Sequence, residues 1–154
     1  MDFRIRGLPA EPFAELFSLS DEALAARGAV RMTADRTPGF PCRISLTDAA
    51  VGDGVTLTHY EHHGVDSPFR SSHAIYVREG ERTFDAVDRV PEMLRSRLLS
   101  LRAFDAQGML RDADVVQGGE LELLVGRLFS AARVAYLHIH FAKPGCYAAL
   151  VERA

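Results

Sequence analysis

The histidines of this chain are confined to two short segments, residues 59–73 and residues 136–147. The six histidines are His59, His62, His63, His73, His138 and His140. The second segment also contains the only lysine and one of the two cysteines. Histidine supplies most of the general acids, general bases and metal ligands that work near neutral pH, so these segments are where a chemical site is expected.

A strand predicted for residues 134–141 places Tyr136, His138 and His140 on one face, because side chains alternate along a strand. Two imidazoles at this spacing stand roughly 6.5–7 Å apart at the backbone, close enough to bind one atom. Candidates for a third ligand are His59, His62, His73 and Cys146. Three protein ligands with an open fourth position are the arrangement of catalytic zinc.

Two features of the second segment argue against a metal. No glutamate follows the histidine pair within the next few residues, and Lys143 brings positive charge close to it. The same pair is explained equally well as a polar sheet face that hydrogen-bonds its neighbours or water. We therefore expect a site without a metal and keep His138 and His140 as the alternative metal ligands.

A site without a metal would use the same segment. Cys146 follows Gly145 at a turn, where a thiol can be exposed and act as a nucleophile. His138 or His140 would be the general base, and Lys143 would stabilise negative charge. The expected catalytic residues are therefore His138, His140, Cys146 and Lys143. A buried, inert thiol is the competing interpretation of Cys146.

Anion recognition is expected from the first segment. Arg70 is followed by Ser71 and Ser72, and a guanidinium with two hydroxyls near a loop suits a carboxylate or a phosphate. A solvated loop explains these residues equally well. The expected ligand-binding residues are His59, His62, Arg70, Ser71, Ser72, His73 and Tyr136.

The elements that would position these residues are short. Alternating or apolar runs bounded by turn residues predict strands at 3–6, 30–33, 42–46, 55–62, 73–78, 97–105, 109–116, 134–141 and 146–152. Helices are predicted at 20–28, 91–96 and 118–130, the last with an apolar face made by Leu121, Leu124, Val125 and Leu128. These elements predict an α+β fold: a curved antiparallel or mixed sheet of about eight short strands with one main helix packed on it. Residues 1–154 are expected to form a single domain.

Composition limits the choice of partners. The net charge of -3 argues against nucleic acid, whose protein partners usually carry a net basic face. No apolar run approaches the roughly 20 residues that span a bilayer, so no membrane partner is expected. The first residues lack the apolar core of a signal peptide, which predicts a cytoplasmic protein. Both cysteines would then be free thiols, although a bond between Cys42 and Cys146 stays open.

Four segments carry a resemblance to a known family: 38–43, 67–78, 98–105 and 145–147. With these segments the chain resembles the bacterial Domain of Unknown Function 1203 family, nearly end to end from Phe3 to Val151. The resemblance implies a single bacterial, cytoplasmic domain. It implies no activity, substrate, cofactor or catalytic residue.

Three functions remain open from sequence, and the patterns do not decide whether the protein is an enzyme or which cofactor it uses. The first is a pocket for a small, anionic metabolite, lined by His, Lys and Cys, with acid/base or thiol chemistry. The second is a non-catalytic interaction module or homodimer with an apolar patch near Phe40, Phe69 and Tyr76. The third is a His-ligated, metal-dependent enzyme that uses His138 and His140.

Overall fold

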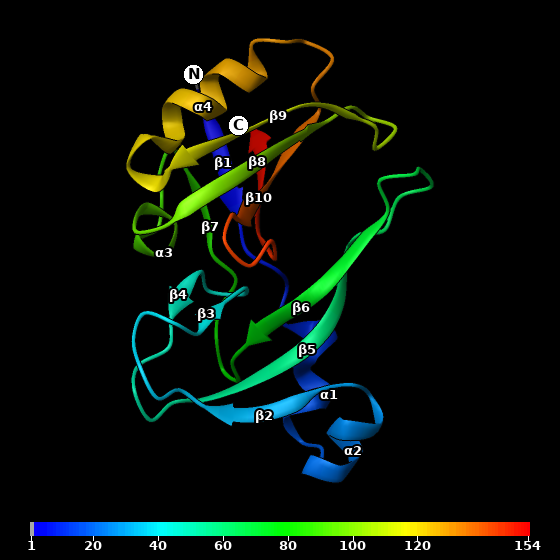
Figure 1. Ribbon diagram of the computed structural model, residues 1–154, viewed down its shortest axis with the longest axis vertical. Helices are drawn as coiled ribbons and strands as arrows, with labels where there is room; N and C mark the ends of the chain where they lie inside the picture. The colour runs from blue at the N-terminus through cyan, green and yellow to red at the C-terminus, as the bar shows by residue number, and fades with distance from the viewer. Residues whose placement is uncertain (1) are drawn as a thin grey trace.

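The computed structural model describes residues 2–154 and shows a mostly β protein with two separate sheets. Strands make up 39% of the chain and helices 19%, and the sheets contain six and five strands. The predicted α+β fold, with one sheet of about eight strands under one main helix, is therefore wrong. In Figure 1 the six-stranded sheet lies in the upper half of the molecule and the five-stranded sheet in the lower half.

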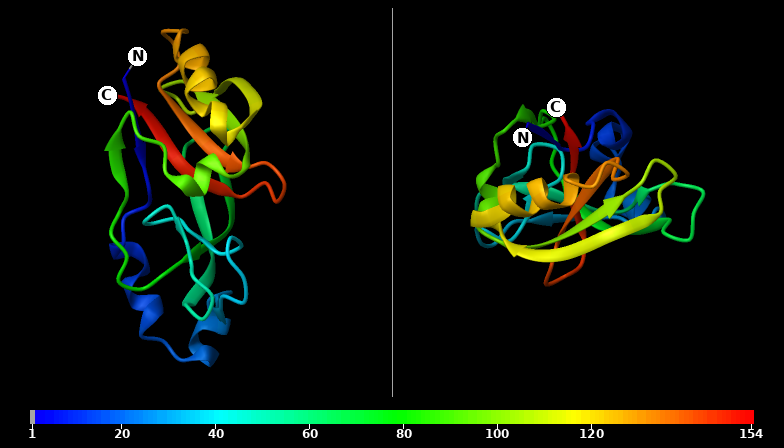
Figure 2. Two further views of the ribbon diagram at one scale, coloured as in Figure 1. Left: turned by 90° about the vertical axis from the view of Figure 1, so that its left-hand side faces the viewer. Right: turned by 90° about the horizontal axis from the view of Figure 1, so that it is seen from above.

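The six-stranded sheet has the order β7-β1-β11-β10-β8-β9, with every neighbouring pair antiparallel. Its strands are β1 (Phe3–Arg6), β7 (Asp85–Val87), β8 (Leu98–Phe104), β9 (Leu110–Gln117), β10 (Tyr136–Phe141) and β11 (Tyr147–Arg153). Because β1 pairs with β11, the two ends of the chain lie side by side (Figure 2).

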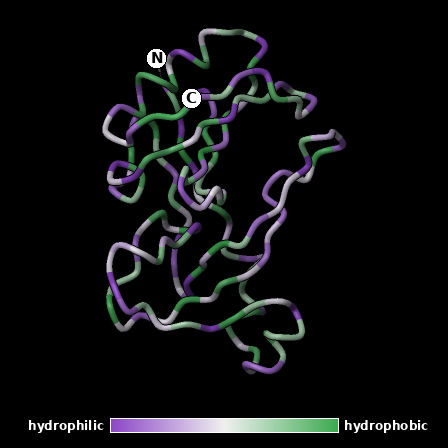
Figure 3. Tube along the Cα trace, in the orientation of Figure 1, coloured by the Kyte–Doolittle hydropathy of each residue, from purple (hydrophilic) through white to green (hydrophobic). Residues whose placement is uncertain are grey.

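One face of this sheet is covered by helix α4 (Leu121–Phe129), which follows the 3₁₀ turn η2 (Gly118–Glu120). The helix buries the apolar face predicted from its sequence, and the leucines of that face share a core with Leu137 and Ile139 of β10. Full burial of each such side chain contributes about 1.5–3 kcal/mol. Apolar residues accordingly follow α4 and the strands beneath it (Figure 3). The short helix α3 (Glu92–Arg95) adds Met93 and Leu94 to the same core.

The five-stranded sheet has the order β2-β5-β6-β3-β4. Its strands are β2 (Val30–Thr33), β3 (Pro41–Cys42), β4 (Thr47–Asp48), β5 (Gly54–His63) and β6 (Ser71–Val77). Only the β3–β6 pair is parallel. A second core lies between this sheet and three short helical segments, η1 (Glu11–Phe13), α1 (Ala14–Phe17) and α2 (Asp21–Ala26).

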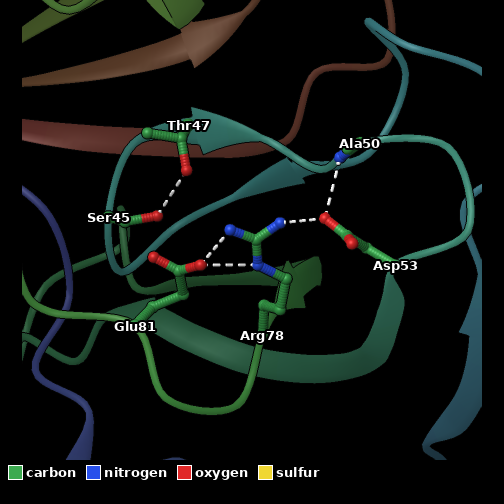
Figure 4. A network of polar contacts seen from close by, with 6 residues as sticks. All are labelled: Ser45, Thr47, Ala50, Asp53, Arg78 and Glu81. Carbon is green, nitrogen blue, oxygen red and sulfur yellow. Dashed lines mark hydrogen bonds and ion pairs between the residues drawn. The ribbon is translucent and has the colours of Figure 1, made fainter.

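Arg78, at the end of β6, fastens the loops of this sheet. Its guanidinium pairs with Glu81 in the following turn and with Asp53 in the turn before β5 (Figure 4). Asp53 in turn accepts a hydrogen bond from the N–H of Ala50 at 2.9 Å. These contacts tie the start of β5 to the end of β6, the two long strands of the sheet.

The single-sheet prediction failed because several elements are too short to show a hydrophobic period. The strands β3, β4 and β7 have two or three residues each, and β7 lies in a segment for which neither a strand nor a helix was predicted. The strand predicted at 42–46 ends at Cys42, and Leu46 has a φ of 54°, which no strand residue adopts. The helix predicted at 20–28 is present as α2, and the Ser20 hydroxyl caps it by accepting from the N–H of Ala23.

A hairpin tip joins the two sheets on one side of the molecule. The β5–β6 hairpin extends towards the β8–β9 hairpin (Figure 1), and the Ser67 hydroxyl donates to the carbonyl of Gly108 at 2.9 Å. Near this tip the register of β5 against β6 shifts between Tyr60 and His63. The irregularity places His62 opposite β10. No helix within residues 2–154 is both long and apolar enough to cross a bilayer.

Candidate metal centre

Three imidazoles from two strands converge between the sheets. His138 and His140 lie on one face of β10, and His62 approaches them from β5. The ring centroid of His62 lies 5.0 Å from that of His140 and 6.0 Å from that of His138. One ring nitrogen from each of the three residues lies within 4.8 Å of the others, which is a group that could hold a metal ion.

Each of these histidines also has a buried ring nitrogen without a hydrogen-bond partner. Within residues 2–154 four buried side-chain nitrogen or oxygen atoms are unpaired, and three of them are Nδ1 of His62, Nδ1 of His138 and Nε2 of His140. The fourth is Nε of Arg6, in β1, which lies between β7 and β11. An unpaired buried polar group costs about 1–3 kcal/mol, so three in one cluster need an explanation.

The orientation of His140 shows which of its nitrogens is free. Nδ1 lies 3.0 Å from the carbonyl oxygen of Gly145. A carbonyl only accepts, so Nδ1 carries the proton and donates. Nε2 therefore has a free lone pair, and it is the nitrogen that is buried without a partner. A backbone carbonyl that fixes the ring and its tautomer in this way is the usual outer-shell partner of a metal-binding histidine.

Burial keeps all three rings neutral at pH 7. Loss of solvent lowers the pKa of His62 to about 4, of His138 to about 2 and of His140 to about 3. The positive charge of Arg102 contributes to the lowering of all three pKa values. Neutral imidazole is the form that binds a metal, so no proton has to be removed from the cluster first.

Tyr147 of β11 forms an aromatic wall of the cluster. Its ring stacks on His62 with centroids 5.0 Å apart, and it meets His138 and His140 edge-on at 5.0 and 5.8 Å. The side chain is 3% exposed, and burial raises the pKa of its phenol. This wall excludes water from one side of the three rings.

His63, the neighbour of His62, has a structural role instead. Its Nδ1 lies 2.8 Å from the carbonyl oxygen of Phe69, and its Nε2 lies 2.6 Å from the hydroxyl of Tyr136. The carbonyl must accept from Nδ1–H, so Nε2 accepts from the tyrosine hydroxyl. Both nitrogens are used, and His63 ties β5 to β10 beside the cluster.

Arg102 of β8 brings a cation to the edge of the cluster. It lies directly opposite His138 in the β8–β10 register. Its guanidinium has no ion pair with another of the described residues, and partial burial alone lowers its pKa. An uncompensated guanidinium beside neutral imidazoles attracts an anion.

Comparison with known proteins agrees with the resemblance drawn from the sequence. Residues 39–153 match the family described as "Protein of unknown function (DUF1203)". The chain belongs to the DUF1203 family. No curated protein and no solved structure matches this DUF1203 chain.

The structure divides the residues that were predicted to bind a ligand. His62 joins the cluster, while Tyr136 is a partner of His63 at its edge. His59 points away from the cluster: it is exposed and hydrogen-bonded to the Ser72 hydroxyl at 2.9 Å. His73 lies near enough to His62 and His140 for its charge to lower both pKa values.

The predicted Arg-Ser-Ser anion site is dispersed. Arg70 is exposed and pairs with Glu61 at 3.0 Å. The Ser71 hydroxyl donates to the carbonyl of Phe69 at 2.8 Å, and Ser72 is on the outside with His59. These side chains do not converge on one point, because neighbouring residues of a strand face opposite sides of the sheet.

The residues predicted to be catalytic also separate into two groups. His138 and His140 form the cluster with His62, whereas Cys146 and Lys143 line a pocket beyond the β10–β11 turn. Cys146 is 7% exposed and contacts Arg43. Both cysteines are free thiols in the structure. Of the apolar patch predicted near Phe40, Phe69 and Tyr76, Phe40 is 4% exposed and packs on Tyr76, while Phe69 and Tyr76 are half-buried.

Sequence reasoning missed the contributions of Tyr147, Arg102 and Arg43. Tyr147 and Arg102 flank the histidine strand in the sheet order, so knowledge of the strand order would have placed both beside it. For Arg43 the sequence carries no signal, because arginine is rarely buried and its neighbours indicated an ordinary strand.

Proposed function

We propose that this protein is a metal-dependent enzyme whose metal is held by His62, His138 and His140. The observation that carries the proposal is the convergence of three imidazoles, with one ring nitrogen of each within 4.8 Å of the others. Each of the three residues also has a buried ring nitrogen without a hydrogen-bond partner. A metal ion accepts the lone pairs of such nitrogens and removes the cost of leaving them unpaired.

The geometry of the cluster requires a small closing movement. Zinc binds imidazole at about 2.0–2.1 Å, and tetrahedral ligand nitrogens then lie about 3.3 Å apart. With all separations within 4.8 Å, the rings approach by at most roughly 1.5 Å on binding. His62 is the ring best able to move, since it is only partly buried and its strand is irregular at this point.

The composition of the cluster favours zinc among the common metals. A set made only of imidazoles suits zinc, copper, iron and nickel, whereas magnesium and calcium require oxygen ligands. The cluster contains no carboxylate and no thiolate. Three protein ligands leave a coordination position for water or a substrate, where the metal acts as a Lewis acid.

Arg102 indicates the class of substrate. Its unpaired guanidinium stands on the strand next to His138, and the metal itself would add positive charge. Both attract a small anionic molecule to the open coordination position. This retains the anionic ligand that the sequence predicted and moves its binding residues from the 70–73 segment to β8 and β10.

The first test is metal content. Untagged protein purified without chelator should contain about one equivalent of zinc, and His62→Ala and His140→Ala should each lose it. His59→Ala is the matched control: this histidine is on the same strand as His62 but faces outwards, and its loss should leave the metal content unchanged.

A second readout covers variants that bind metal weakly. Cobalt(II) added to chelator-treated protein should give the intense visible absorption of a four-coordinate site, absent from His138→Ala. Absence of metal from the purified protein, together with no cobalt spectrum and no stabilisation by added zinc, would overturn the proposal. A spectrum retained in all three histidine variants would contradict it as well.

A further inference from the structure

A pocket of about 870 Å³ lies on the other side of the β10–β11 turn from the histidine cluster. It is enclosed by the loop before β3, by His73 and Tyr76 of β6, by the start of β8 and by the turn that contains Lys143. Its volume is that of a typical small-molecule site. The metal proposed above does not take part in it.

The charges around this pocket have one sign. Its lining includes Arg36, Arg43, Arg97 and Lys143, and none of the lining residues is an aspartate or a glutamate. The chain as a whole carries more acidic than basic residues, with a net charge of -3. The pocket is therefore positively charged although the chain as a whole has a negative net charge.

Only one of these cations is fully neutralised by the protein. Arg97 makes a two-pronged pair with Asp48 at 2.6 and 2.9 Å. Arg36 meets Asp35 at 3.3 Å at the surface, where such a pair is worth little. Lys143 has no ion pair with another of residues 2–154 and is exposed at the rim.

Arg43 is the unusual member of the set, because it is only 1% exposed and has no carboxylate partner. Its guanidinium donates to the carbonyls of Tyr147 and Pro41 and to the sulfur of Cys146, each within 2.8 Å. These three contacts use three of its five N–H donors. Burial and the nearby charge of Arg97 lower its pKa, which reflects a charge that the protein does not balance.

Arg43 and Arg97 both lie against the aromatic ring of Phe141. The guanidinium carbon of each lies 4.9 Å from the centroid of the Phe141 ring. The ring compensates part of the charge of both. The charge of Arg97 lowers the pKa of Arg43, so the two cations repel each other, and an anion between them and Lys143 relieves that repulsion.

We propose that this pocket binds a small molecule through its oxyanion group, a phosphate or a carboxylate. Arg43 forms the buried end of the site, while Lys143 and Arg36 at the rim complete the positive surroundings. Guanidinium groups match both kinds of oxyanion through paired N–H donors.

The test is a titration of chelator-dialysed protein with two probes, sodium phosphate and sodium malonate, at constant ionic strength set with sodium chloride. Binding is followed by calorimetry and by the melting temperature. Because metal is removed first, an anion cannot bind to a metal at the histidine cluster. The test of this pocket therefore stays valid even if the protein binds no metal. We expect saturable binding of at least one probe, whereas sodium chloride alone should give no binding signal. The probe that binds more tightly identifies the oxyanion group of the ligand as a phosphate or a carboxylate.

The variants locate the binding. Lys143→Gln and Arg36→Gln change exposed side chains, and together they should weaken the better probe about tenfold. Arg70→Gln is the matched control, an exposed arginine paired with Glu61 away from the pocket, and should leave the affinity unchanged. The proposal is overturned if neither probe binds, if the double variant binds as tightly as the unchanged protein, or if Arg102→Gln alone abolishes binding.

Discussion

At the scale of single residues, the state of each imidazole follows from its hydrogen bonds. His140 is oriented by the carbonyl of Gly145 and keeps a free lone pair, whereas His63 uses both nitrogens and has none to offer. His59 bonds a serine at the surface. These three histidines thus differ in chemistry because their hydrogen-bond partners differ, and of the three only His140 belongs to the group that could hold a metal ion.

Acid should destabilise the chelator-treated protein through the two buried imidazoles. Their pKa values are about 2 for His138 and about 3 for His140, against 6.5 for an unperturbed histidine. Below pH 6.5 the unfolded chain therefore binds protons that the folded chain does not, so stability falls as the pH falls. We expect a loss of roughly 1 kcal/mol per pH unit for each ring, measured by urea unfolding between pH 7 and pH 5. His140→Gln should reduce this dependence of stability on pH, and an unchanged dependence would contradict the lowered pKa of His140.

The hydroxyl of Tyr136 should contribute to stability through His63. Tyr136→Phe leaves Nε2 of a histidine that is 3% exposed without its donor, which costs about 1–3 kcal/mol. Tyr60→Phe is the control, because the Tyr60 ring packs on Phe13 at 5.4 Å and its hydroxyl has no hydrogen bond within residues 2–154. Chemical denaturation of both variants gives the difference, and equal losses would argue against the His63 contact.

At the scale of elements, each strand supplies its site residues through its period and its irregularities. The period of β10 places His138 and His140 on one face, and this much could be predicted from the sequence. The sequence left the third ligand open among His59, His62, His73 and Cys146, because the choice depends on the register shift in β5 and on how the two sheets meet. Arg43 was missed for a related reason: only the packing of β3 against the β10–β11 turn shows that this charge is buried.

Replacing each of two glycines near α4 by alanine should change the stability of the protein in opposite directions. A Cβ at Gly118 would lie 1.9 Å from the carbonyl oxygen of Leu94, so Gly118→Ala forces η2 away from α3 and costs about 2–4 kcal/mol. Gly126 lies within α4 with open space around its Cα, and Gly126→Ala should raise stability by about 0.5–1 kcal/mol. Thermal unfolding of the pair tests both signs, and a neutral Gly118→Ala would contradict the close approach.

At the scale of the whole molecule, the candidate metal centre lies where two separately built sheets meet. Each sheet has its own core, and the His63–Tyr136 bond, the Arg43 contacts and the hairpin tip join them. The cluster takes two ligands from one sheet and one from the other. The affinity of the proposed metal site should therefore depend on contacts that never touch the metal.

Ser67→Ala tests this dependence at the hairpin tip. The change removes the hydrogen bond from Ser67 to Gly108 and the one that Ser67 accepts from the N–H of Phe69. Because the tip holds β5 over β10, we expect zinc or cobalt affinity to fall roughly three- to tenfold, from a loss of about 0.5–1.5 kcal/mol. Competition with a chromophoric chelator measures the affinity. Thr47→Ala, at the opposite edge of the five-stranded sheet, should have no effect, and equal losses in both variants would count against the coupling.

The division of the ligands between a strand and a hairpin also has a kinetic consequence. His138 and His140 stand two residues apart on a central strand and are ready to capture a metal together, whereas His62 has to close onto it from the neighbouring sheet. Uptake should then proceed in two phases, a concentration-dependent capture by β10 and a concentration-independent closure of β5. Release of the metal should begin at His62. The His62→Ala variant should therefore raise the dissociation rate of the metal far more than it lowers the rate of capture.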